Sequence, residues 1–263
     1  MNDNNFYSEY HDNNSKSYVN DMSITETSTA LTKAYFWMFI GALLTFLSGI
    51  LFSTLFANLI VSNNAVGLSF FMVCFVISFI VEMVLCFTIN KNALVKADSK
   101  KALTGYLVYS LLNGFTFSSF FIYFDASVLV QVFGVVAIYY LILTLISVAF
   151  KNKIHKIAAF AWIGLITLVI ASAIVSIYSL IAYSVTGSVS MPLYLGISIF
   201  GLIVFSILTI VDIKSMTNLI SNSYNKKAAS IAAAFSLYLD FINIFIYVLR
   251  ILLILGKNSS RKN

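Results

Sequence analysis

Residues 236–250 read SLYLDFINIFIYVLR, a run of large apolar side chains that contains one aspartate, Asp240. The apolar run extends on both sides to cover 228–255, and no glycine or proline interrupts it. About 20 helical residues are enough to cross the hydrocarbon core of a bilayer. The stretch is therefore predicted to form one continuous membrane-spanning helix with a carboxylate near its middle.

Six further apolar segments precede this one along the chain. They are expected to cover 35–60, 65–89, 102–124, 127–150, 157–183 and 191–213. Unbroken apolar runs of this length favour helices over the short alternating segments of a membrane β-barrel. With 60% apolar and 10% charged residues, the composition also excludes a water-soluble domain. We therefore expect an all-α polytopic membrane protein with seven transmembrane helices.

The two ends of the chain differ in composition from these segments. Residues 1–34 are rich in asparagine, serine, tyrosine and aspartate, and they contain no apolar run that could act as a signal peptide. They are expected to form a disordered cytoplasmic tail. The membrane domain is expected to cover 35–255, followed by a short basic tail at 256–263.

The lysines between the segments predict the orientation in the membrane. All of them fall in three of the gaps: Lys91, Lys96, Lys100, Lys101, Lys151, Lys153, Lys156, Lys214, Lys226 and Lys227. This asymmetry places those gaps and the N-terminus in the cytoplasm. Because the positive charges are divided among separate gaps, a nucleic-acid partner is not expected. The expected environment is the lipid bilayer of a bacterial plasma membrane.

The C-terminal tail raises an alternative topology. Seven crossings from a cytoplasmic start place this tail outside, although it carries Lys257, Arg261 and Lys262. A re-entrant last segment would return it to the cytoplasm, but a hairpin needs a break in the helix that 228–255 does not contain. Seven crossings with a continuous last helix are therefore predicted.

Ionisable residues inside the apolar segments are few: Glu82, Asp212, Asp240 and Arg250. Such a group at the bilayer centre costs about 2.5–3.5 kcal/mol on insertion scales, and it usually marks an ion or proton pathway. Simpler interpretations exist for three of them. Asp212 could be an end-of-helix acid beside Lys214, and Arg250 could extend to the interface or pair with Glu82. Asp240 is too deep for such an explanation.

Polar residues recur at helical spacing in three of the segments. The stripes are Ser236, Asp240, Asn243 and Tyr247; Thr209, Asp212 and Ser215; and Cys74, Ser78, Glu82 and Cys86. Residues three or four apart share one face of a helix. The three stripes are expected to meet inside the bundle, where Asp212, Asp240 and Glu82 would line an ion pathway.

Residue types that membrane enzymes need are missing from the segments. The two histidines, His11 and His155, both lie outside them. Intramembrane metal hydrolases and serine proteases with a Ser/His pair need a histidine within the membrane. The last segment also has no lysine for a retinal Schiff base, and no phosphate-binding loop occurs. We therefore expect no enzymatic activity and no cofactor.

The run 236–250 closely resembles the last-helix signature of the Bax inhibitor-1 family, which comprises the transmembrane Bax inhibitor motif proteins and their bacterial relatives. The stretch VDIK around Asp212 looks like the acid of that family's sixth helix. Glu82 occupies a plausible second-helix acid position, and Gly105 with Tyr106 fits the start of the third helix. The resemblance covers about 35–255, and this chain looks like a bacterial member.

The resemblance implies six helices around a central C-terminal helix that act together as a pH-sensitive calcium leak. The family's paired aspartates carry over to Asp212 and Asp240, which would also offer a Ca²⁺ site, with Ca²⁺ as the transported ion. Bacterial members use an arginine near the cytoplasmic end of the second helix as a latch to this pair. Here Lys91, or else Lys96, stands closest to that position. Lysine is a point charge and lacks the bidentate fork of arginine.

Our hypothesis is that Asp212 and Asp240 face each other and share a proton, because two close carboxylates cannot both ionise cheaply in a low dielectric. The stripe residues that would support the pair are Ser236, Asn243, Tyr247 and Thr209. Ca²⁺ prefers oxygen ligands and would compete with protons there. Two alternatives stay open: a proton-coupled transporter of another solute, and a non-transporting regulatory or quality-control protein with membrane partners of unknown identity.

Overall fold

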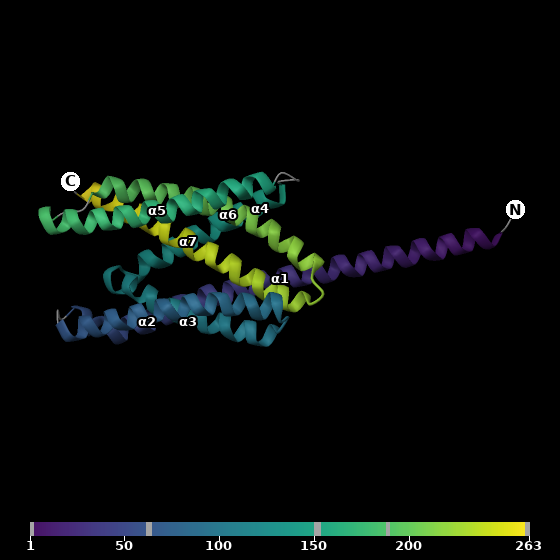
Figure 1. The fold of residues 1–263 in the computed structure, drawn as a ribbon, viewed down its shortest axis with the longest axis horizontal. Coiled ribbons are helices and arrows are strands. Elements are labelled where there is room, and N and C mark those ends of the chain that lie inside the picture. Colours follow the sequence, from purple (N-terminus) through teal and green to yellow (C-terminus); the bar gives the residue numbers. More distant parts are fainter. Residues whose placement is uncertain (1–2, 62–64, 150–153, 188–189, 261–263) are drawn as a thin grey trace.

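The computed structural model describes residues 3–61, 65–149, 154–187 and 190–260, and it is helical throughout these ranges apart from short connections (Figure 1). The helices are α1 (Asp3–Val61), α2 (Ala65–Asn90), α3 (Ser99–Tyr123), α4 (Ala126–Ala149), α5 (Ile154–Thr186), α6 (Met191–Asn222) and α7 (Lys226–Ser260). A π-helical turn, η1 (Lys91–Val95), extends α2. The prediction of an all-α fold with seven helices is confirmed.

Within the described ranges, six helices are long and apolar enough to cross a membrane, and α3 is not among them. This is a difference from the segment predicted at 102–124. The reason is composition, because α3 carries polar residues along its length. Ser110, Asn113 and Ser118 are all buried inside the bundle. α3 therefore hides its polar face against other helices.

Both ends of the chain are more helical than we expected. α1 begins at Asp3 and projects beyond the bundle as one helix, where a disordered tail over 1–34 was expected (Figure 1). No glycine or proline precedes Gly41, so nothing in the sequence stops the helix from continuing outward. At the other end α7 is unbroken and runs to Ser260, through much of the expected tail at 256–263. Residues 261–263 lie outside the described part of the chain.

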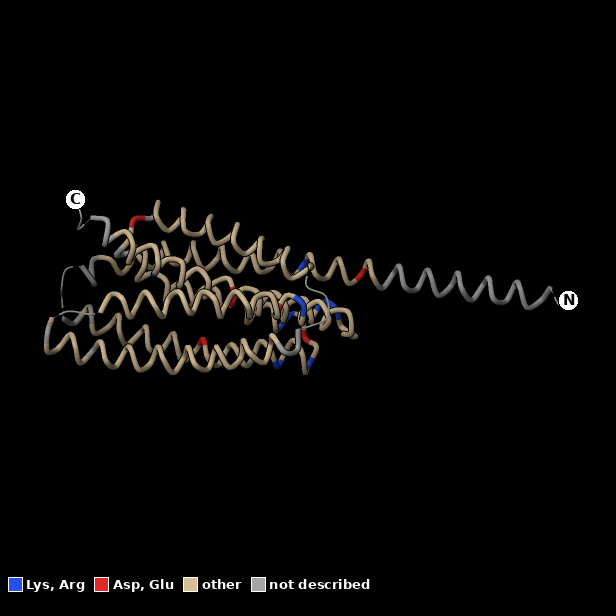
Figure 2. The backbone as a smooth tube through the Cα atoms, turned by 90° about the horizontal axis from the view of Figure 1, so that it is seen from above, with Lys and Arg blue, Asp and Glu red and all other residues tan. Residues whose placement is uncertain are grey.

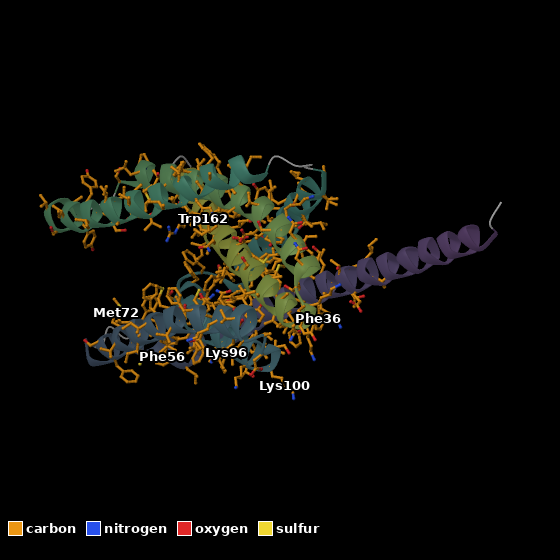
Figure 3. The ribbon with its side chains drawn as sticks, turned by 45° about the vertical axis from the view of Figure 1, so that its right-hand side comes forward. Phe36, Phe56, Met72, Lys96, Lys100 and Trp162 are labelled. Carbon is orange, nitrogen blue, oxygen red and sulfur yellow. The ribbon has the colours of Figure 1, made fainter. Side chains whose placement is uncertain are left out.

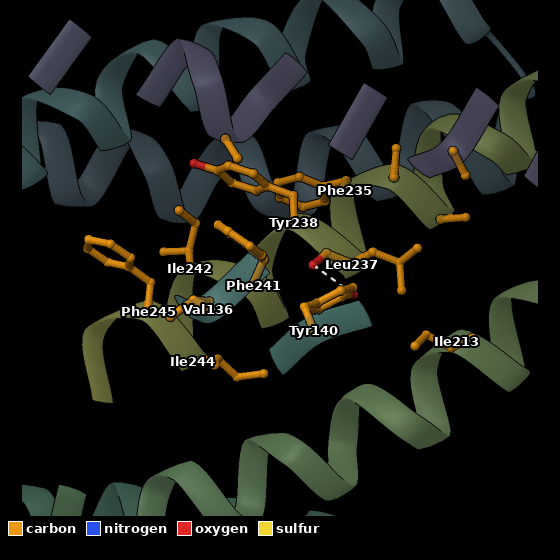
Figure 4. Packing of buried hydrophobic residues seen from close by; sticks show 14 of the residues in the cluster. Val136, Tyr140, Ile213, Phe235, Leu237, Tyr238, Phe241, Ile242, Ile244 and Phe245 are labelled. Atoms are coloured by element: carbon orange, nitrogen blue, oxygen red, sulfur yellow. Dashed lines mark hydrogen bonds between the residues drawn. The ribbon is translucent and has the colours of Figure 1, made fainter. Parts of the chain in front are cut away.

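α7 forms the core of the bundle and crosses between a group containing α1, α2 and α3 and a group containing α5 and α6 (Figure 1). It packs against α1, α3, α4 and α6, whereas α2 packs mainly on α3 and α5 mainly on α6. Its most buried large side chains are Phe235, Leu237, Tyr238, Ile244 and Leu249. The first four of these are labelled in Figure 4. The C-terminal helix is therefore central, as expected, and its most extensive contacts are with four of the other helices.

The outer helices present apolar side chains to the surroundings. Met72 on α2 and Trp162 on α5 are both more than half exposed (Figure 3). Many neighbouring side chains on the same two helices are large, apolar and exposed as well. Such a surface is unfavourable in water and suits contact with lipid chains.

The lysines gather at the end of the bundle from which α1 projects (Figure 2). Two connections at this end are tied together by Asn225, whose Oδ1 accepts a hydrogen bond from the Ala228 N–H (3.1 Å) and whose Nδ2 donates to the Ala97 carbonyl (2.8 Å). The N-cap of α3, Asp98, accepts a hydrogen bond from the Lys101 backbone N–H, which lowers the pKa of the Asp98 carboxyl. Lys151 and Lys153 lie outside the described residues.

Candidate functional site

The structure brings the acid of α6 against the polar stripe of α7. The Ser236 hydroxyl on α7 donates a hydrogen bond to Asp212 Oδ2 on α6 at 2.7 Å. Asp240 follows Ser236 by four residues, so its side chain lies one turn further along the same face. The two carboxylates interact electrostatically with each other. A seryl hydroxyl and two acids from neighbouring helices therefore form one polar site, which we call the aspartate pair.

Asp240 is the more deeply placed member of the pair. Only 6% of its surface is exposed, and its Oδ2 atom is buried with no hydrogen-bond partner among the described residues. A charged oxygen left unpaired in such a place is costly, by several kcal/mol or more. A proton or a bound cation would remove that cost. The geometry thus leaves one acceptor in the core of the bundle ready to take either.

A tyrosine from α4 completes the surroundings of the pair. The Tyr140 hydroxyl donates to the Leu237 carbonyl at 3.2 Å (Figure 4), and Tyr140 interacts electrostatically with Asp240 and Asp212. It is buried between α4 and α7. The part played by Tyr140 could not be predicted from the sequence, because helical spacing does not tell which neighbouring helix a tyrosine faces.

Three other residues expected to support the pair make their contacts elsewhere. The hydroxyl of Thr209 and the amide of Asn243 each donate to a carbonyl one turn back in their own helix, at 2.7 and 2.8 Å. Tyr247 stacks on Phe205 with ring centroids 5.7 Å apart. Of the expected supporting residues, Ser236 alone forms a hydrogen bond to an aspartate within the described part of the chain.

The third acid, Glu82, lies apart from the pair, between α2 and α3. Its Oε1 accepts hydrogen bonds from the Thr116 hydroxyl at 2.9 Å and the Ser78 hydroxyl at 3.2 Å. Ser78 belongs to the same predicted stripe, whereas Thr116 comes from α3. Glu82 is buried, so its carboxylate faces the interior of the bundle. It lies on the side of α7 that carries Tyr238, and not on the side that carries Asp240.

A second polar cluster occupies this other side of α7. The Tyr238 hydroxyl lies 2.7 Å from Thr45 Oγ1 of α1 and accepts a hydrogen bond from Asn113 Nδ2 of α3 at 2.6 Å. Thr45 Oγ1 also donates to the Ser110 carbonyl at 2.9 Å. Residues two apart point to nearly opposite faces of a helix, so Tyr238 and Asp240 leave α7 in different directions. Sequence analysis missed this cluster, although Asn113 and Thr45 were visible as polar residues in apolar runs.

The two basic residues considered as partners of acids do not reach them. Lys91 is exposed, and no ion pair between it and an acid occurs among the described residues. Arg250 is exposed too, with its guanidinium 5.8 Å from the centre of the Tyr247 ring. The latch expected at Lys91 is therefore not formed in this structure, because the Lys91 side chain is exposed, whereas the buried residues of η1 are Asn92 and Ala93.

The site offers too few ligands to hold a resident metal ion. In the described ranges no three His, Cys, Asp or Glu side chains come together as a possible metal site. Ca²⁺ takes six to eight oxygen ligands in proteins. Two carboxylates and the Ser236 hydroxyl fall short of that number, so water or carbonyl oxygens would have to supply the rest.

Removal of the Ser236 hydroxyl is expected to weaken the contact between α6 and α7. Ser236→Ala takes away the donor to Asp212, which should lower the free energy of unfolding by about 1–2 kcal/mol. Ser230→Ala is the control, because Ser230 also lies on α7 and is more buried than Ser236, but it donates only to the Lys227 carbonyl of its own helix at 2.9 Å. Thermal unfolding of the purified protein in detergent measures both. Equal losses in the two variants would contradict this assignment.

Comparisons with known proteins agree with this architecture. Residues 27–259 match the family described as Bax1-I, inhibitor of apoptosis-promoting Bax1. A protein of Borreliella burgdorferi is 29% identical over 210 residues, covering 78% of this chain and 86% of the relative. The inner membrane protein YbhL of Escherichia coli K12 is 27% identical over 230 residues, covering 85% and 90%. An uncharacterized membrane protein of Streptococcus pyogenes serotype M1 is 31% identical over 183 residues, covering 68% and 73%.

Proposed function

Because this chain belongs to the family of the inhibitor of apoptosis-promoting Bax1 and is an integral membrane protein, we propose that it is a pH-sensitive calcium leak gated by Asp212 and Asp240. The observation that carries the proposal is the hydrogen bond from Ser236 to Asp212, with the unpartnered Oδ2 of Asp240 one turn away. The activity is passive transport, with no enzymatic reaction and no cofactor.

The proposed gate works through the contact between α6 and α7. One proton shared by the two carboxylates lets them hydrogen-bond and holds the helices together. Loss of that proton leaves two like charges in a low dielectric, where their repulsion is much stronger than in water. A change in the protonation of the pair therefore shifts the packing of α6 against α7. This shift opens or closes the proposed path of the calcium ion through the bundle. Ca²⁺ competes for the same oxygens, so its passage depends on the proton occupancy.

The proposed orientation places the lysine end of the bundle, and with it the N-terminus, in the cytoplasm. The clustering of lysines at one end supports it, since positive charges are retained on the cytoplasmic side. A bacterial plasma membrane is the proposed location, in keeping with the bacterial sources of the relatives.

Calcium flux in proteoliposomes tests the proposed function. Purified protein is reconstituted, a calcium gradient is imposed, and flux is recorded with an internal calcium dye at several pH values between about 5 and 8. We expect flux down the gradient whose rate changes severalfold across this range, because the shared proton titrates. Protein-free liposomes of the same lipid provide the background.

A simultaneous recording of internal pH distinguishes the alternatives. Calcium flux without a coupled proton current supports the leak. Movement of protons with another solute, and none with calcium, would instead indicate a proton-coupled transporter. Absence of any flux would contradict both transport proposals and favour a regulatory membrane protein.

A further inference from the structure

A cavity of about 740 Å³ opens at the lysine end of the bundle, between α1 and the start of α7, well away from the aspartate pair. Its walls come from α1 and from the α6–α7 connection with the first turn of α7. The lining residues are Thr25, Glu26, Thr29, Ala30, Lys33, Tyr224, Asn225, Lys226, Lys227 and Ser230. Three lysines and one glutamate give this cavity, which we call the basic groove, a positive net charge.

The charged side chains of the basic groove differ in whether they form an ion pair. Lys226 forms an ion pair with Glu26, 3.2 Å between Nζ and Oε2, and a hydrogen bond to Thr27 Oγ1 at 3.3 Å. Lys33 and Lys227 are exposed and form no ion pair with any described residue. Glu26 is thus already neutralised, and two positive charges from different helices face one cavity. Such an arrangement is suited to an anion.

The floor of the basic groove is held in place by hydrogen bonds. Asn225 caps α7 through the Ala228 N–H and also binds the Ala97 carbonyl, which fixes the α6–α7 connection against the start of α3. The groove therefore includes the N-terminal turn of a long helix, whose dipole is positive at this end. The helix end adds to the attraction that Lys33 and Lys227 exert on an anion.

The position of the groove identifies the source of that anion. The candidate membrane-spanning stretches begin at Ile24 on α1 and at Lys226 on α7. One turn beyond Lys33, large apolar side chains of α1 such as Phe36 are exposed (Figure 3). The groove thus lies where a lipid-facing surface starts. Lipid headgroups occupy this level of a membrane. We propose that the basic groove binds the phosphate headgroup of an anionic phospholipid between Lys33 and Lys227, a site independent of the proposed calcium leak.

Native mass spectrometry of the full chain in detergent tests this site, with phosphatidylglycerol and phosphatidylcholine as probes. The wild-type protein is expected to retain phosphatidylglycerol in preference to phosphatidylcholine. One lysine near an anionic lipid is worth roughly a fivefold gain in binding, so K33Q/K227Q should bind phosphatidylglycerol roughly 30-fold more weakly. K96Q/K100Q is the matched control, since both of these lysines are exposed at the same end of the bundle (Figure 3) but do not line the groove. This variant should change the affinity for phosphatidylglycerol less than about twofold.

A charge-preserving variant and a competitor complete the experiment. K33R/K227R should keep the preference, which separates loss of charge from loss of folding in the glutamine variant. Equal weakening by K33Q/K227Q and K96Q/K100Q would overturn the proposal, because it would indicate general attraction to a basic surface. Displacement of phosphatidylglycerol by an equal concentration of inorganic phosphate would also overturn it, since the ligand would then be a soluble phosphate.

Discussion

Asp240→Asn is expected to abolish the pH dependence of calcium flux in proteoliposomes. Asparagine has nearly the same shape as aspartic acid and can still donate a hydrogen bond to Asp212, but it neither gains nor loses a proton in this pH range. The variant therefore retains the proposed hydrogen bond between α6 and α7 at every pH. The ratio of the flux rates at pH 5 and pH 8, severalfold in wild type, should fall to about one.

The control for this variant is Asp125→Asn. Asp125 lies exposed in the connection between α3 and α4, so its substitution makes the same chemical change outside the bundle. Its pH profile should match that of wild type. If Asp240→Asn kept the wild-type profile as well, the aspartate pair would not be the gate. Calcium flux itself could still occur, so the proposed transport and the proposed gate can fail separately.

Gly114→Ala is expected to cause a large loss of stability. A Cβ atom at Gly114 would collide with the Ser48 hydroxyl and lie 2.6 Å from the backbone oxygen of Thr45. A side chain can rotate away, but a helical carbonyl cannot, so α1 and α3 would have to separate. Glycine permits such close approach of membrane helices. Overpacking of this kind costs about 1–3 kcal/mol, and separation of the helices would also strain the bonds of Thr45 to Ser110 and Tyr238.

Gly134→Ala offers the matched comparison, because a Cβ atom there has no neighbour within 4 Å. Alanine favours helix over glycine by up to about 1 kcal/mol, so this variant should be neutral or slightly stabilised. One kcal/mol of lost stability lowers the unfolding temperature by roughly 2–4 °C in a protein of this size. The unfolding temperature in detergent should therefore fall by several degrees for Gly114→Ala and should not fall for Gly134→Ala. Comparable unfolding temperatures for the two variants would show that α1 and α3 do not pack as closely as described.

Local patterns in the sequence were sufficient for the helices and for part of the site. The apolar run at 228–255 predicted a helix that the structure describes at Lys226–Ser260. Spacing of three and four residues put Ser236 and Asp240 on one face, and the structure places Ser236 against Asp212. Such predictions succeed because the helical period and the thickness of the membrane act on each segment separately.

Contacts between helices could not be read in this way. Tyr140 and Tyr238 lie outside the three predicted polar stripes, yet each forms a hydrogen bond to another helix. Glu82 shares its polar stripe with Ser78, but its second partner, Thr116, comes from α3. The choice of partner depends on which helices pack together and at what rotation, and a single-helix pattern carries no information on either.

The sequence by itself determined that this chain is a helical membrane protein, where its helices run, and which acids they carry. Hydrophobicity and helical periodicity act locally and therefore leave a direct record in the order of residues. Only the tertiary structure decided that Asp212 meets Ser236, that Glu82 stands apart between α2 and α3, and that Lys33 and Lys227 face one cavity. Side-chain volumes and close approach of glycine faces set these contacts, and they depend on pairs of helices that are distant along the chain.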